Sequence, residues 1–178
     1  MTPKPVSAVL NDGSAIGTWE LDASGSSVTI LAKSMWGLVR VRGGFGELSG
    51  SGRVASDGSI TGRLVIKAES IDTRNKKRDT HLGSADFFDA TEHPDITLTV
   101  TSVGIVGDGE LRVTGELEAA GNRQPASFTA RVAELDETSV TLDATFTIDR
   151  TAFGMTWNPM RVSSGPVAAS ASLHFTLV

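Results

Sequence analysis

Strict alternation between apolar and polar residues recurs along this chain of 178 residues and limits what it can fold into. The clearest example is residues 139–148, in which Val140, Leu142, Ala144, Phe146 and Ile148 alternate with Ser, Thr and Asp residues. Successive side chains of an extended strand point to opposite faces, so a period of two places these apolar residues on one face. Similar runs occupy residues 26–33, 60–68, 96–101, 111–118, 126–132 and 169–177. The pattern predicts an all-β protein of about eight antiparallel strands.

Length and composition indicate one domain and exclude several kinds of function. A chain of 178 residues with 39% hydrophobic content is long enough for one buried core. A formal net charge of -5 argues against a nucleic-acid partner, because phosphates require a basic surface. With no Cys, the sequence excludes disulfides, thiolate catalysis and Cys-based metal sites, and it fits a reducing compartment.

Residues 1–16 read as a flexible N-terminal tail before the folded domain at 17–178. The tail contains Pro3, Pro5 and Asn11-Asp12-Gly13, and its apolar run, Ala8-Val9-Leu10, is too short for a signal-peptide core or a membrane span. We therefore expect a cytoplasmic protein without an integral membrane segment.

The alternation is interrupted between Arg78 and Pro94, where charged, aromatic and small residues crowd together. These side chains need partners and cover, so the segment is neither a core strand nor a plain solvated turn. We expect a structured connection near residues 75–90 that contains a short helix.

The same segment carries a resemblance to a known family. The string Arg78-Asp79-x-His81-Leu82-x-Ser84-x-Asp86-Phe87-Phe88-Asp89, with Pro94, resembles the signature of the YceI-like family of lipocalin-like barrels that bind polyisoprenoid lipids. Four further motifs match in order: Trp19-Glu20-Leu21-Asp22, Gly43-Gly44-Phe45 with Gly50, Ser70-Ile71-x-Thr73, and Ile148-Asp149-Arg150 with Phe153-Gly154. Five ordered motifs over nearly the whole chain are far more specific than one short pattern.

The strand pattern alone is compatible with a sandwich or a barrel, and the resemblance implies a single antiparallel lipocalin-like β-barrel. It also implies a non-enzymatic protein that binds, transports or sequesters an isoprenoid or another long apolar lipid, without a cofactor. This chain departs from the family at two places. Ser34 replaces a His common at the end of the second strand, and Leu98 replaces an aromatic residue.

The inward-facing residues leave two possibilities open for the interior. Many are small, namely Ala32, Gly62, Ala68, Gly115, Ala130, Ala144, Ala169 and Ala171, which favours a cavity with an apolar occupant. The alternative is that Phe45, Phe128, Phe146, Phe175 and the tryptophans fill the space. The resemblance favours the cavity, whose expected lining is Trp36, Ile66, Arg78, His81, Leu82, Phe87, Phe88, Leu98, Phe128, Phe146, Arg150, Phe153 and Trp157.

Polar residues near the expected mouth admit several interpretations. Arg74, Lys76, Lys77 and Arg78 would hold a polar head group or form a solvated loop, and Arg78, Asp79, Asp149 and Arg150 would form structural ion pairs. An alternative interpretation is an enzyme that acts on an apolar substrate in the same cavity, with His81 and Asp79 as its acid and base. A ligand-free structural module in stress response is the other alternative, and loop aromatics would allow a homodimer. The spacing of Asp79, His81, Asp86, Asp89 and His93 matches no established metal site, so no metal is expected.

Overall fold

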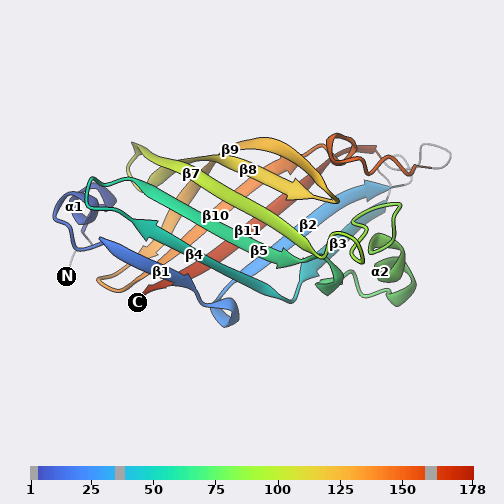
Figure 1. Cartoon of the computed structure of the whole chain (residues 1–178), viewed down its shortest axis with the longest axis horizontal. Coiled ribbons are helices and arrows are strands. Elements are labelled where there is room, and N and C mark those ends of the chain that lie inside the picture. The colour runs from blue at the N-terminus through green and yellow to red at the C-terminus, as the bar shows by residue number, and fades with distance from the viewer. Residues whose placement is uncertain (1–3, 35–38, 159–163) are drawn as a thin grey trace.

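The protein is a closed antiparallel β-barrel with a short helix at each end (Figure 1). The computed structural model describes residues 4–34, 39–158 and 164–178. Within that part of the chain the strands are β1 (Gly17–Leu21), β2 (Ser27–Ser34), β3 (Val39–Phe45), β4 (Leu48–Val54), β5 (Ile60–Lys67), β6 (Ile71–Asp72), β7 (Asp95–Gly107), β8 (Glu110–Ala119), β9 (Asn122–Leu135), β10 (Ser139–Ile148) and β11 (Ser164–Leu177). The helices are α1 (Val6–Asn11) and α2 (Lys76–Leu82), with 3-10 turns η1 (Ala23–Gly25), η3 (Ala68–Ser70) and η4 (Arg150–Phe153). No helix in these ranges is long and apolar enough to span a membrane.

Eight strands close the barrel in the order β1-β4-β5-β7-β8-β9-β10-β11, and β11 pairs back with β1. The closing register sets Trp19 opposite Leu177 and Leu21 opposite Phe175. The earlier part of β11 pairs instead with β2, which carries β3 and β6 and extends the wall beyond the ring at the α2 end. The predicted all-β barrel of about eight strands, with a helical interruption near residues 75–90, is confirmed.

The alternation predicted from the sequence decides which side chains enter the barrel. Across β10 and β11, Leu142 pairs with Leu173, Ala144 with Ala171, and Phe146 with Ala169, so that the apolar residues of both strands share the inner face. Of the eight small residues expected inside, six line a cavity, namely Ala32, Gly62, Ala130, Ala144, Ala169 and Ala171. Gly115 has another role, because a Cβ there would collide with the carbonyl oxygen of Thr99 on the neighbouring strand.

The N-terminal segment differs from the loose tail that its composition indicates. Residues Val6–Asn11 form α1, and Val9 and Leu10 pack against the buried cluster of Ala15, Trp19 and Val54. The Trp19 indole nitrogen donates a hydrogen bond to the carbonyl oxygen of Ala15 at 2.9 Å. The barrel supplies the apolar surface that the isolated segment lacks, which residue composition alone does not reveal. The boundary between tail and domain stays a prediction.

Figure 1 shows α1 and α2 at opposite ends of the barrel, with β4, β5 and β7 running between them. The α2 connection is held together by hydrogen bonds within itself, from a side-chain cap and from the backbone. Asn75 caps the helix by accepting a hydrogen bond from the backbone nitrogen of Arg78, and the nitrogen of Phe88 donates to the carbonyl of Leu82. These bonds place the side chains of the connection over one mouth of the barrel.

Candidate functional site

The barrel contains a cavity of about 370 Å³ at its α2 end. Its lining is mostly apolar, and the strands contribute aliphatic and aromatic side chains that alternate inward as the sequence predicts. The lining residues are Val28, Ile30, Ala32, Lys33, Val41, Phe45, Leu64, Ile66, Arg78, His81, Leu82, Phe87, Phe88, Ile96, Leu98, Leu117, Ala119, Phe128, Ala144, Phe146, Ile148, Arg150, Phe153, Met155, Trp157, Val167, Ala169, Ser170, Ala171 and Leu173. A volume above 300 Å³ falls within the usual range for ligand pockets.

Aromatic rings from the α2 connection cover the mouth of this cavity. Phe88 meets Phe45 edge to face, with ring centroids 6.0 Å apart. His81 contacts both Phe87 and Trp157, at centroid distances of 5.2 and 4.4 Å respectively, and these two rings also contact each other at 5.6 Å. Trp157 is 41% exposed, so this cluster marks the boundary between the apolar interior and solvent. Rings in edge-to-face contact provide a large apolar surface, and the polar ring nitrogen Nε2 of His81 is satisfied by Asp86.

Deeper in the barrel, Phe128 of β9 stacks on Phe146 of β10 with centroids 4.8 Å apart. Opposite Phe146 in the register stands Ala169, which is buried and too small to fill the space that the rings leave. The alternative in which the aromatic residues fill the interior is therefore only partly realised, because the phenylalanines stack on one another beside open volume.

The expected cations at the mouth have separate roles. Arg74, Lys76 and Lys77 are exposed and lie outside the cavity lining. Arg78 lines the cavity, but its guanidinium donates to the hydroxyl and carbonyl oxygens of Thr73, both at 2.7 Å. Thr73 in turn donates from its backbone nitrogen to Asp79 at 2.9 Å. Arg78 and Asp79 are thus joined through Thr73 rather than as the expected ion pair, and they anchor α2.

Arg150 is the cation whose guanidinium faces the aromatic cluster. Its Nη1 atom donates to the carbonyl oxygen of Trp157 at 3.0 Å, and its Cζ atom lies 5.7 Å from the centroid of the Phe87 ring. Partial burial lowers the pKa of Arg150, and the nearby Asp149 carboxylate opposes that effect. The Asp149 carboxylate itself accepts hydrogen bonds from Thr151. Arg150 therefore keeps donors near the mouth in partly desolvated surroundings.

His81 and Asp79, the acid-base pair expected if the protein were an enzyme, do not form a hydrogen-bonded pair. His81 lines the cavity, but the carboxylate at its Nε2 atom, 2.7 Å away, belongs to Asp86. Asp79 is bonded to Thr73 instead. In the part of the chain that the structure describes, no three His, Asp or Glu side chains are grouped so that they would hold a metal ion.

Twelve of the thirteen residues expected in the site line this cavity, and Trp36 lies outside the described residues. Sequence reasoning missed several lining residues, most clearly Val28, Ile30 and Phe45, although the alternation of residues 26–33 already placed two of them on an inward face. Lys33, which falls on the polar parity of residues 26–33, lines the cavity as well. Whether the lining residues bind a ligand stays a prediction.

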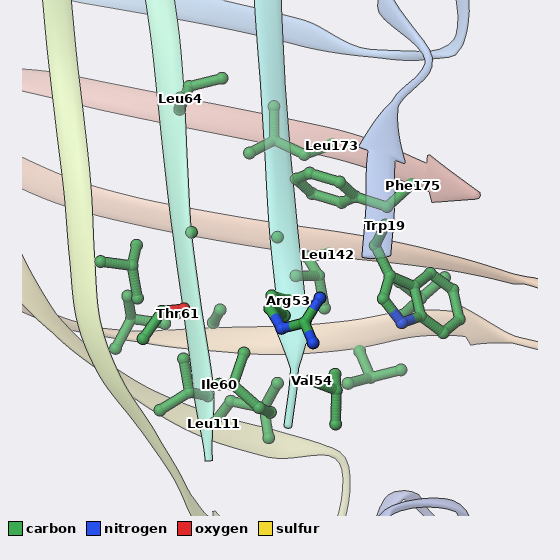
Figure 2. Close-up of a pocket in the computed structure, with 18 of the residues that line it drawn as sticks. Trp19, Arg53, Val54, Ile60, Thr61, Leu64, Leu111, Leu142, Leu173 and Phe175 are labelled. Atoms are coloured by element: carbon green, nitrogen blue, oxygen red, sulfur yellow. The ribbon is translucent and has the colours of Figure 1, made fainter. Parts of the chain in front are cut away.

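A second cavity of about 210 Å³ lies in the same barrel toward α1 (Figure 2). In Figure 2, Trp19, Leu142, Leu173 and Phe175 from the barrel wall gather around it with Ile60 and Leu111. Six residues line both cavities, namely Leu64, Leu98, Phe128, Ala144, Ala171 and Leu173. The barrel thus has an outer chamber under α2 and an inner chamber under α1, and the six shared residues, called the waist below, lie where the two linings meet.

Comparison with known sequences decides the family, because the sequence model of the YceI-like domain matches residues 19–178. The chain belongs to the YceI-like family. A UPF0312 protein of Shewanella denitrificans is 30% identical over 163 residues, which cover 88% of this chain and 84% of that relative. Protein YceI of Shigella flexneri is 42% identical over 69 residues, a stretch that spans only 36% of that relative.

Solved structures share the YceI-like barrel. BcnA of Burkholderia cenocepacia superposes with a TM-score of 0.78 at 22% identity, over 86% of this chain and 98% of BcnA. A polyisoprenoid binding domain from Saccharophagus degradans, implicated in plant cell wall breakdown, gives 0.76 at 20% identity, over 90% of this chain and 98% of that domain. At these identities the similarity establishes the fold, and the expected lipocalin-like barrel is confirmed.

Proposed function

We propose that this YceI-like barrel binds a polyisoprenoid or a similar long apolar lipid in its interior and transports or sequesters it without chemical conversion. The observation that carries the proposal is the outer chamber of about 370 Å³, whose lining is apolar except at the rim. The structural similarity to a polyisoprenoid binding domain supports the same class of ligand.

Burial of a hydrocarbon chain is sufficient to drive binding. Each buried methylene contributes about 0.8 kcal/mol, so about ten buried carbons contribute on the order of 8 kcal/mol before ordering costs. Polar contacts then have only to orient the head group. Arg150 fits this role, because its guanidinium is partly desolvated and lies beside Trp157 and Phe87 at the rim. A phosphate or carbonyl oxygen of the head group would accept hydrogen bonds from these guanidinium donors.

Organic extraction of the purified protein, followed by mass spectrometry, tests the proposal directly. We expect a prenyl or other long-chain lipid in stoichiometric amount, or uptake of added polyprenol by lipid-free protein. The Phe88→Asp variant places a charge in the chamber and should lose the lipid. The matched control, Thr145→Asp on the exposed face of β10, should keep it. Absence of both co-purified lipid and polyprenol uptake in a folded protein would reject the function.

Three finer expectations stay predictions. The absence of catalysis is tested by recovering an added polyprenol chemically unchanged after incubation. The cytoplasmic location is tested by cell fractionation, and the homodimer by sedimentation at several concentrations.

A further inference from the structure

Helix α1 closes the end of the barrel that faces away from the proposed lipid mouth. Val6, Val9 and Leu10 line the inner chamber, whereas Ser7 and Asn11 on the same helix are exposed. The match to the YceI-like domain begins at residue 19, so α1 precedes the residues that the family model covers. The far end of this barrel is thus closed by an element that the family motifs do not include.

The helix is held in place by packing rather than by its own stability. It has six residues, no side chain caps its first turn, and no charged residue complements either end. A helix this short does not persist alone in water. Val9 and Leu10 make apolar contacts with the cluster of Ala15, Trp19 and Val54, and the Ser14 hydroxyl donates a hydrogen bond to the Val9 carbonyl oxygen at 3.3 Å. Lys4 and Asp12, which flank the helix, form an exposed ion pair at 3.2 Å. Exposed pairs of this kind contribute little.

The two chambers share part of their lining, so a long chain that passes between them would occupy both. The waist between them includes Ala144 on β10 and Ala171 on β11, which face each other in the strand register and leave room beside the stacked rings of Phe128 and Phe146. An apolar chain that enters under α2 would reach the inner chamber beside Ala144 and Ala171 and, if long enough, would meet α1.

We propose that α1 is an end stop that sets the maximum length of the lipid chain. This inference rests on the proposed function and adds a specificity element to it. The inner chamber takes the distal carbons of the chain, and Val6, Val9 and Leu10 form its floor. Chains that reach this floor gain every available apolar contact. Longer chains must either leave carbons in solvent at the α2 mouth or displace α1 from the barrel.

A series of polyprenols from farnesol to undecaprenol, titrated into lipid-free protein, tests the end stop. In the full chain we expect affinity to rise about fourfold for each further buried carbon and then to level off when the chain meets α1. The double variant Val9→Asp with Leu10→Asp puts two charges on the inner face of α1 and should release it. For this variant the affinity should keep rising, by tenfold or more, over at least one isoprene unit beyond the length at which the original chain levels off.

The matched control carries the same two charges on the exposed face of the same helix, as Ser7→Asp with Asn11→Asp, and should level off at the same length as the original chain. If the releasing variant does not fold, Val9→Phe replaces it. The larger ring enters the chamber, so the affinity should level off at a shorter chain with farnesol binding unchanged. Identical length dependence in all variants would overturn the end stop and leave the proposed function intact, whereas no polyprenol binding by the original chain would overturn both.

The position of the chain end gives a second readout. Trp19 lines the inner chamber and is buried, and the other tryptophans of the sequence, Trp36 and Trp157, are removed by substitution to Phe. Linear alkanols with a terminal bromine, from dodecanol to eicosanol, then quench Trp19 only if their ends reach it. We expect quenching to begin at a threshold length. Quenching that is independent of length, or absent at every length despite binding, would contradict the path through the waist.

Discussion

Two alanines test whether the barrel interior is hollow, because each lines one chamber only. Ala169 on β11 faces the outer chamber and Ala130 on β9 faces the inner one, with exposed fractions of 4% and 3%. Substitution to Leu adds the same three carbons at either position. In a filled core such an addition costs about 1–3 kcal/mol of unfolding free energy, whereas filling a cavity stabilises by about 0.5–2 kcal/mol. We expect both lipid-free variants to be more stable than the original protein in thermal or urea unfolding.

The same substitutions should separate short lipids from long ones. Three added carbons displace about three carbons of the ligand, which removes about 2.4 kcal/mol and raises Kd about 60-fold. Ala169→Leu should impose this loss on every chain, since every chain occupies the outer chamber. Ala130→Leu should impose it only on chains long enough to pass the waist. Thr145→Leu, on the exposed face of β10, is the control and should change neither quantity.

The combined outcome is decisive. If Ala169→Leu and Ala130→Leu both lower the stability of lipid-free protein by about 1–3 kcal/mol, the interior is already filled and the binding proposal has no volume to rest on. Titration calorimetry or tryptophan fluorescence then measures the Kd for farnesol and for a longer polyprenol on the same samples.

Three further perturbations address single contacts. Gly115→Ala should lower the unfolding free energy by about 3 kcal/mol in a urea titration, because the new Cβ collides with the Thr99 carbonyl oxygen. The control is Gly104→Ala, which should be nearly neutral because nothing lies within 4 Å of its new Cβ. Arg150→Met should weaken the binding of a prenyl phosphate about tenfold more than the binding of the matching prenol, since a desolvated charge-assisted contact is lost. Equal weakening of both ligands would show that Arg150 acts only through packing. Hydrogen bonds from Thr151 hold the pKa of Asp149 below its ordinary value of 3.8. The bonds that cap η4 are therefore fully present above pH 3.8 and are lost as the pH falls through the lowered pKa. An NMR titration in which Asp149 protonates at or above its ordinary value would contradict this.

Much of the site could be predicted because it follows from alternation and from one unusual segment. Ile66, Leu98, Phe128 and Phe146 sit on inward positions of regular strands, where a period of two leaves little choice of face. The α2 connection was recognisable because it breaks that period. The prediction failed for polar partners, since Asp86 rather than Asp79 meets His81, and Thr73 lies between Arg78 and Asp79. Spacing in sequence does not determine which of several carboxylates a turn brings within reach.

Residue pattern by itself determined the strand class, the inward faces, the interruption at residues 75–90 and the family. Tertiary structure alone decided the closure of β1 against β11, the docking of α1 and the division of the interior into two chambers joined at Ala144 and Ala171. The physical reason is that alternation is a local property of the backbone, readable within one strand. Closure and cavity volume depend on how side chains from strands far apart in sequence meet across the barrel. The residue pattern of a single strand does not determine which distant strands it will contact.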